Sequence, residues 1–242
     1  MATLVLGATG ATGRLVVEQL IQRGKKTKLI VRSTEQLPTH IKVHELVTIT
    51  VDNVLDMSDE QLMEHLRGCD SVVSCLGHNL TLKGMFGQPR RLVTNVTKRV
   101  CRAIEALQPE QPVKFVLMNT TGNQNKSAGE LVSASHFAVV SLLRILLPPH
   151  VDNEQAAAFL QNQITKDSAY IQWVGVRPDS LVDQVAPSAY DVHHSPTRDP
   201  IFNAGQTSRA NVAHFMASLL TDPQLWQRWR GHLPVIYNSD GS

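Results

Sequence analysis

The chain has 242 residues, of which 42% are hydrophobic and 18% are charged. This composition suits a folded globular protein and argues against a disordered chain or a coiled coil. The length lies within the range of α/β folds that form one unit, so we expect a single domain over residues 1–242. The net charge of +2 is spread along the sequence, which argues against a nucleic-acid partner.

The first residues lack the charged segment and apolar core of a secretory signal, because a short apolar strand runs directly into a glycine-rich loop. We therefore expect a cytoplasmic protein. The longest apolar stretch, residues 136–147, contains Arg144 and is much shorter than the roughly 20 apolar residues that span a bilayer. The sequence thus predicts no association with a membrane.

Cysteine and histidine spacing indicates neither disulfides nor a metal centre. The 3 cysteines form no C-x-x-C pair, and we interpret them as reduced, buried thiols: Cys69, Cys75 and Cys101. Several histidines invite a metal-site or triad interpretation but lack both H-x-x-x-H spacing and a G-x-S-x-G motif: His136, His150, His193 and His194. We therefore predict no metal site.

Short apolar runs rich in β-forming residues alternate with segments of helical spacing along the chain. The predicted strands are Thr3–Leu6, Lys28–Val31, Val47–Val51, Ser71–Ser74, Lys114–Met118 and Ile171–Val176. The predicted helices include Leu15–Ile21, which ends before Gly24, Leu92–Leu107, and Ser208–Leu220. Continuously apolar strands are buried on both faces, and strand–helix alternation requires right-handed crossovers. The sequence therefore predicts an α/β fold with a doubly wound parallel sheet, the Rossmann fold.

Two long connections follow predicted strand ends, His78–Pro89 and Gly122–His150. Ligands of open α/β sheets bind beyond the carboxyl ends of the strands, so we expect these connections to form substrate walls. A small C-terminal extension from Arg177 onward, with the apolar run Leu233–Tyr237, is expected to complete them. Within the first connection, Leu82–Gly87 combines a cation, flexible apolar side chains and glycines, which is typical of a mobile lid; a permanently packed loop is the alternative.

The segment Gly7-Ala8-Thr9-Gly10-Ala11-Thr12-Gly13 follows the first strand and opens the first helix. In that context the spacing G-x-x-G-x-x-G indicates dinucleotide binding. Glycines permit a tight turn and close approach of a pyrophosphate, while the helix N-terminus offers N–H donors and the positive end of its dipole. A glycine-rich turn without a ligand is the alternative. The predicted cofactor-binding residues of this loop are Gly7, Thr9, Gly10, Ala11, Thr12 and Gly13.

The end of the second strand indicates which dinucleotide binds. An acidic residue there would accept a hydrogen bond from the ribose 2′-hydroxyl of NAD, whereas an arginine would meet the 2′-phosphate of NADP. The sequence is Val31-Arg32-Ser33, without Asp or Glu. Arg32 offers a forked donor that matches phosphate, with Ser33 and Arg14 as helpers. The sequence therefore favours NADP(H), with a solvated surface arginine as the alternative.

These motifs resemble those of the atypical short-chain dehydrogenase/reductase superfamily, in particular the NAD(P)H-binding group that includes biliverdin-IXβ/flavin reductase and NmrA-like proteins. The resemblance spans most of the chain and rests on residues 7–13, 29–32, 51–56, 73–77 and 176–178. It implies that Asp52 and Asn53 contact the adenine. It also implies that the backbone of Cys75, Leu76 and Gly77 passes along the ribose and pyrophosphate, while the Cys75 thiol packs in the core.

The resemblance further implies a Ser or Thr beside the nicotinamide at the end of the fifth strand, where this sequence has Thr120 and Thr121. A hydroxyl there can donate to a substrate oxygen. Ordinary strand-end chemistry is the alternative for both threonines. His78 directly follows Gly77 and begins the loop that faces this end; it could donate to substrate or hydrogen-bond within the protein.

Two departures from the family pattern bear on the reaction. No Tyr-x-x-x-Lys is present, because Tyr170, Tyr190 and Tyr237 have no Lys four residues later, and Asn153 stands where the flavin-reductase group often has His. No strong general acid is therefore apparent from the sequence. We predict an NADP(H)-dependent reductase that passes hydride to a flat substrate such as a flavin, a quinone or a similar conjugated acceptor, which can take its proton from solvent. The alternatives are a non-catalytic NADP(H)-binding redox sensor of the NmrA-like type and, less favoured, a nucleotide-sugar epimerase or dehydratase.

Overall fold

The computed structural model describes residues 1–78, 87–125, 129–130, 148–165 and 167–239. The expected lid Leu82–Gly87 and the connection Gly122–His150 therefore lie largely outside the described residues.

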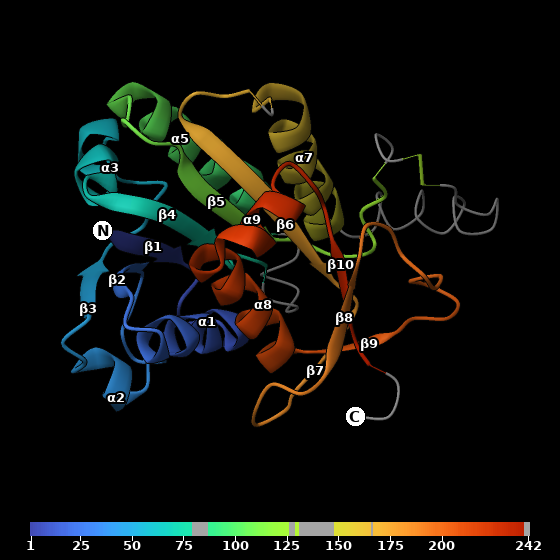
Figure 1. Cartoon of the computed structure of the whole chain (residues 1–242). Helices are drawn as coiled ribbons and strands as arrows, with labels where there is room; N and C mark the ends of the chain where they lie inside the picture. Colours follow the sequence, from blue (N-terminus) through green and yellow to red (C-terminus); the bar gives the residue numbers. More distant parts are fainter. Residues whose placement is uncertain (79–86, 126–128, 131–147, 166, 240–242) are drawn as a thin grey trace.

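An eight-stranded sheet forms the centre of the molecule, in the order β3-β2-β1-β4-β5-β6-β10-β8 (Figure 1). The six strands predicted from the sequence are all present and parallel to their neighbours: β1 (Ala2–Leu6), β2 (Lys26–Val31), β3 (Val47–Val51), β4 (Cys69–Ser74), β5 (Val113–Met118) and β6 (Ile171–Pro178). The chain order of the strands reverses between β1 and β4. Such a reversal opens a crevice at the carboxyl edge of a parallel sheet.

Helices cover both faces of this sheet (Figure 1). One face carries α1 (Ala11–Gln22), α8 (Arg209–Thr221) and α9 (Pro223–Trp229), and the other carries α3 (Asp59–Leu66), α5 (Leu92–Leu107) and α7 (Pro148–Gln163). The short helix α2 (Thr39–Lys42) follows β2. The predicted doubly wound Rossmann-like α/β fold is confirmed.

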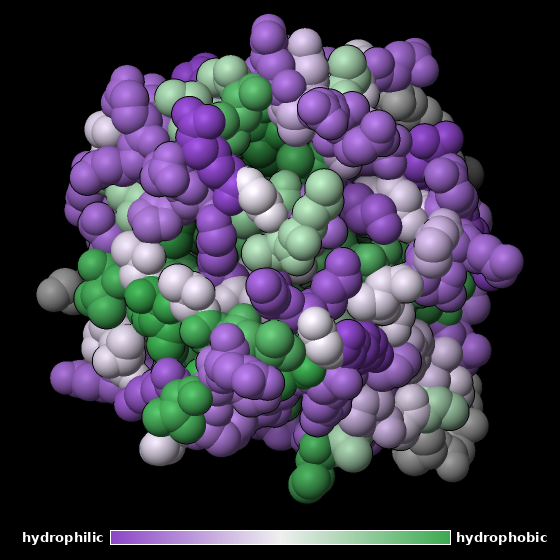
Figure 2. Space-filling view, turned by 60° about the vertical axis from the view of Figure 1, so that its left-hand side comes forward, coloured by the Kyte–Doolittle hydropathy of each residue, from purple (hydrophilic) through white to green (hydrophobic). Residues whose placement is uncertain are grey.

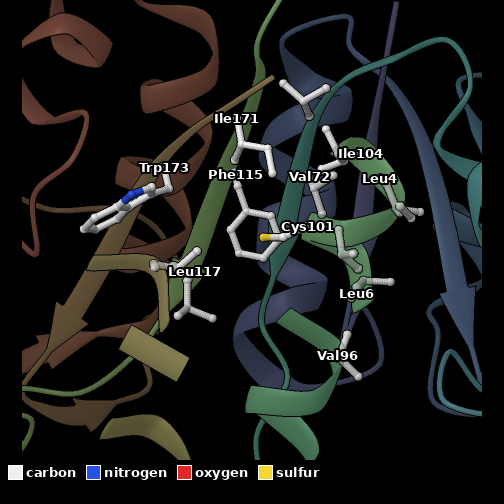
Figure 3. Packing of buried hydrophobic residues seen from close by; sticks show 14 of the residues in the cluster. Leu4, Leu6, Val72, Val96, Cys101, Ile104, Phe115, Leu117, Ile171 and Trp173 are labelled. Carbon is white, nitrogen blue, oxygen red and sulfur yellow. The ribbon is translucent and has the colours of Figure 1, made fainter. Parts of the chain in front are cut away.

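Buried side chains alternate between two cores, one on each face of the sheet. On β5, Phe115 and Leu117 enter the core beneath α3, α5 and α7, whereas Val116 enters the core beneath α1 and α8. Figure 3 shows Phe115 among apolar side chains of β1, β4, β6 and α5. This two-sided burial explains why the central strands are continuously apolar in sequence.

The C-terminal part of the described chain adds strands that the sequence did not predict. β10 (Val235–Asn238) lies parallel to β6 and β8 (Tyr190–His193) antiparallel to β10, while β7 (Ser180–Val182) and β9 (Gln206–Ser208) form a separate two-stranded sheet. These strands have 3 or 4 residues each. The residues of β7 and β8 are half-buried or exposed and lack a clear apolar pattern, whereas β10 has three buried residues and includes most of the apolar run Leu233–Tyr237. They form the expected small extension beyond β6.

Among the described residues, few large apolar side chains are exposed. The most exposed are Met1, Val43, Val51, Val185 and Phe202. On the face shown in Figure 2, apolar residues form small patches among hydrophilic ones. No helix among the described residues is long and apolar enough to cross a membrane.

A buried arginine ties the extension and the segment after β5 to the end of β6. Arg177 is fully buried and all of its guanidinium hydrogens have acceptors. Two of them bind both carboxylate oxygens of Glu130 at 2.6 and 3.0 Å. The others bind the backbone carbonyls of Leu233, Asn123 and His194. Removing one partner from such a buried pair leaves a charge without compensation.

We therefore expect Glu130→Gln to lower the free energy of unfolding by about 3–5 kcal/mol, because Arg177 would stay buried beside a neutral amide. Urea denaturation followed by circular dichroism measures this change. The control is Asp183→Asn, which breaks the pair between Arg209 and an Asp183 side chain that is 87% exposed. That variant should change stability by less than about 1 kcal/mol. Equal losses in both variants would contradict the role assigned to Glu130.

Candidate functional site

The glycine loop packs against the end of β4 more closely than any side chain would allow. Gly7 has φ +78°, and a Cβ on it would lie 2.6 Å from the carbonyl oxygen of Cys75. A Cβ on Gly13 would lie 2.1 Å from the carbonyl oxygen of Gly7. Both positions therefore require glycine. This packing leaves bare backbone at the crevice between β1 and β4, where a parallel sheet binds its ligand.

The first helix begins inside this crevice without a side-chain cap. Gly10 is the N-cap residue of α1, and its carbonyl accepts a hydrogen bond from the backbone N–H of Arg14. No described side chain accepts a hydrogen bond from the first turn, Ala11 to Gly13, and that turn holds no acidic residue. Thr9 is half-buried and Thr12 is buried beside it. The N–H groups and the positive end of the helix dipole thus remain for an anion.

Charged and polar residues follow β2 at the same edge. Arg32 is exposed and makes no hydrogen bond or ion pair with any described residue, and Arg14 is half-buried on α1. Ser33 is exposed, and its hydroxyl oxygen accepts a hydrogen bond from the backbone N–H of Glu35 at 3.2 Å. The Arg32 guanidinium is therefore available for an anion beside the glycine loop.

After β3, Asp52 and Asn53 form a tight turn. The backbone N–H of Asp52 donates to the carbonyl of Val31, which joins this turn to β2. The Asp52 carboxylate accepts the N–H of Asn53 at 2.6 Å. The Asn53 side chain accepts the N–H of Leu55 and donates to the carboxylate of Asp56. Asn53 thus shapes the turn with its side chain, while Asp52 is half-buried at the edge of the crevice.

The end of β4 contributes backbone rather than reactive side chains. The N–H of Cys75 donates to the carbonyl of Leu6 at 2.9 Å. Burial raises the pKa of the Cys75 thiol to about 12, so it stays protonated and packs in the core as predicted. Leu76 packs against the core, and Gly77 is exposed with open space where a Cβ would stand.

His78 follows and is held by a buried carboxylate from α7. Its Nε2 lies 2.8 Å from an oxygen of Asp152, and the two side chains are 4% and 0% exposed. The same carboxylate accepts the backbone N–H groups of Val93 and Thr94 and therefore caps the N-terminus of α5. The sequence left open whether His78 donates to substrate or hydrogen-bonds within the protein. For Nε2 the structure shows the hydrogen bond within the protein.

The hydrogen bonds to Asp152 control its charge. Burial alone would raise the pKa of this carboxyl, but the hydrogen bonds from His78, Thr94 and Val93 outweigh it and hold the pKa below its usual value. Asp152 is therefore an anion at neutral pH, placed where the α5 dipole stabilises it.

The two threonines after β5 have different surroundings. Thr121 is 4% exposed, and its hydroxyl is hydrogen-bonded to the carboxyl of Asp179, a group whose pKa burial raises. Thr120 is half-buried, and its hydroxyl oxygen accepts the N–H of Gly122 at 3.3 Å. Of the two hydroxyls, that of Thr120 is thus the better placed to meet a ligand.

The first turn of α7 lies against this strand end and adds residues that sequence reasoning missed. The Asn119 side chain donates to the backbone carbonyl of Asn153 at 2.9 Å. The ring of His150 borders Gly122, and Glu154 follows His150 one helical turn later. The H-x-x-x-E spacing at a helix start was the available signal, because residues four apart share one helix face. No group of three or more His, Cys, Asp or Glu in the described part of the chain is arranged for a metal ion.

The strand reversal, the close-packed glycine loop and the uncapped helix together define a dinucleotide-binding protein of the Rossmann type. The chain belongs to the NAD(P)H-binding family, whose sequence model matches residues 7–223. No curated protein matches the chain at a significant level.

Solved structures with the same fold include three that cover nearly the whole chain. A short-chain dehydrogenase/reductase from Veillonella parvula in complex with NADP has a TM-score of 0.71 and 13% identity, covering 99% of this chain and 95% of its own. The anaerobillin reductase ChuY from Escherichia coli has a TM-score of 0.68 and 15% identity, covering 100% of this chain and 99% of its own. The oxidoreductase YlbE from Lactococcus lactis has a TM-score of 0.69 and 17% identity, covering 99% of this chain and 91% of its own. At these identities the likeness shows the shared fold.

We expect Asp152→Asn to lower the free energy of unfolding at neutral pH by about 2–3 kcal/mol, because an amide cannot accept from all three donors. A carboxyl whose pKa is lower in the folded state contributes stability above its unfolded pKa, about 3.9, and loses it as pH falls through the folded value. The gap between wild type and variant should therefore close as the pH falls below about 4. Urea unfolding across pH tests this. The control is Asp59→Asn, at an 80% exposed side chain. A gap that persists at acid pH would contradict the charged role of Asp152.

Proposed function

We propose that this protein is an NADP(H)-dependent reductase whose substrate is a flat, conjugated acceptor such as a flavin or a quinone. The observation that carries the proposal is the glycine loop, in which Gly7 and Gly13 leave no room for side chains and open an uncapped helix at the strand reversal. The bound dinucleotide would supply hydride.

The residues around the crevice fit an NADP molecule in chemical type. In our proposal the N–H groups of Ala11, Thr12 and Gly13 bind the pyrophosphate, helped by Thr9 and Gly10. Arg32 binds the 2′-phosphate, with Ser33 beside it, because its exposed guanidinium has no partner among the described residues. Asp52 and the backbone of Asn53 bind the adenine. The backbone from Cys75 to Gly77 lines the ribose and pyrophosphate.

The reacting end is proposed to lie beyond β4 and β5. Thr120 orients the ligand there through its half-buried hydroxyl. Thr121 holds Asp179, and His78 holds the backbone after Gly77 through its bond to Asp152. The absence of Tyr-x-x-x-Lys favours an acceptor that becomes a stable anion on reduction over a simple alcohol or ketone. A reductase among the similar folds, ChuY, supports this class of activity.

Turnover is tested by mixing the purified protein with NADPH and a panel of flavins, quinones and carbonyl compounds. The loss of nicotinamide absorbance measures the reaction. We expect oxidation of NADPH with at least one conjugated acceptor and none with simple alcohols or ketones. Tight NADPH binding without turnover of any acceptor would overturn the proposed reductase activity and favour the redox-sensor alternative. Absence of NADPH binding would overturn both.

Arg32→Asp is expected to weaken NADPH binding about tenfold or more, because it removes a charge-assisted hydrogen bond to the 2′-phosphate and adds repulsion. NADH binding should stay the same or improve, since Asp can accept from a free ribose hydroxyl. Isothermal titration of wild type and variant with both cofactors measures the preference. The matched control is Arg230→Asp, the same charge change at an exposed residue beside the start of β6. Equal weakening of both cofactors by Arg32→Asp would contradict NADP selectivity.

A further inference from the structure

A histidine lies at the carboxyl end of β5 that the mechanism so far does not use. His150 stands in the first turn of α7, and the hydrogen bond from Asn119 to the carbonyl of Asn153 fixes that turn against the strand end. A Cβ on Gly122 would lie 3.2 Å from Cε1 and 3.5 Å from Nδ1 of His150, and 3.7 Å from the hydroxyl oxygen of Thr120. The imidazole and the Thr120 hydroxyl therefore border the same point above Gly122.

One ring nitrogen of His150 lacks a hydrogen-bond partner among the described residues. The His150 side chain is 11% exposed, and Nε2 is buried without a hydrogen-bond partner among the described residues. Buried polar atoms are nearly always paired, so an unpaired one in a native protein calls for an explanation, of which a catalytic role is one. The ring presents its Cε1–Nδ1 edge toward Gly122 and Nε2 toward Glu154 of α7.

Glu154 supplies the charge that a protonated imidazole needs. Its Oε1 lies 3.4 Å from Nε2 of His150, without the alignment of a hydrogen bond, and its side chain is 18% exposed. Protonation of the ring would turn this unsatisfied contact into an ion pair in a largely buried setting, where opposite charges interact strongly.

We propose that His150 is the proton donor of the reductase and that Glu154 is its positioning residue. The inference rests on the proposed function. As hydride adds to one end of a conjugated acceptor, the electron pair moves to an oxygen or nitrogen at the other end. The N–H bond at Nδ1 of His150 breaks, the proton joins that atom, and the imidazole keeps the electron pair. Solvent then reprotonates the ring. Thr120 orients the acceptor so that this atom lies within reach of Nδ1.

The two other described residues that the sequence singled out at this end are less suited to the task. His78 has Nε2 bound to Asp152, and that carboxylate also serves two backbone N–H groups. Thr121 is bound to Asp179. A threonine hydroxyl is too weak an acid to be the proton source at neutral pH, whereas an imidazole changes charge in this range. His150 therefore replaces the missing Tyr-x-x-x-Lys donor by a different residue.

The position of His150 is tested first without turnover. Protein with ¹⁵N-labelled histidine is titrated with NADP⁺, which cannot give hydride, while calorimetry monitors binding. The resonance lost in His150→Gln identifies His150. We expect it to shift with saturation, whereas His65 on α3 stays unchanged. Binding without any shift of His150 would overturn the inference and spare the proposed function. No binding of NADP⁺ would overturn both.

Turnover then tests the role. His150→Gln should slow reduction of the best acceptor by on the order of 10²-fold, while NADPH affinity and the unfolding midpoint stay near wild type. Glu154→Gln should have a smaller effect, and the double variant should be no slower than His150→Gln, because Glu154 acts through His150. His65→Gln is the matched control and should keep full activity. A fast His150→Gln enzyme, or additive losses in the double variant, would overturn the assignment.

Discussion

The close approach of the glycine loop to the carbonyl of Cys75 is the constraint on which the rest of the site depends. Because Gly7 and Gly13 carry no side chains, α1 can begin directly beside the ends of β1 and β4. This position turns the first N–H groups of α1 into the crevice at the strand reversal. A side chain at either glycine would clash with backbone atoms and force the loop and the helix apart. In our proposal the cofactor site is built from backbone, and side chains such as Arg32 add selectivity.

A second link connects the cofactor crevice to the reacting end. The Asp152 carboxylate joins three segments, since it holds His78 after β4, caps α5 and belongs to α7. Because α7 is fixed in this way, its first turn lies against the end of β5, where Asn119 adds a further hydrogen bond. The helix α7 therefore contributes both to stability and to the proposed reaction. The residues proposed to orient an acceptor and to donate a proton owe their placement to a buried anion that touches neither.

The sequence predicted the parts of the structure that depend on local pattern. The strands β1, β2, β4, β5 and β6 were predictable from their buried apolar runs, and the half-exposed edge strand β3 from its β-branched residues. Gly24 ends α1 with a φ of +69° as expected. The helix α3 was missed although Ser58 and Gln61 form a capping box that the sequence contains. The short strands β7 to β9 offered no apolar period. The partnerships of His78 with Asp152 and of Thr121 with Asp179 join residues far apart in the chain, so no spacing rule could predict them.

We propose that the glycine loop binds the pyrophosphate of NADP and that Arg32 binds its 2′-phosphate. A crystal structure of the protein grown with NADP⁺ tests it most directly. The account predicts density for the pyrophosphate over the N–H groups of Ala11 to Gly13 and a 2′-phosphate in contact with the Arg32 guanidinium. A dinucleotide bound elsewhere, or a 2′-phosphate that points away from Arg32 into solvent, would contradict it.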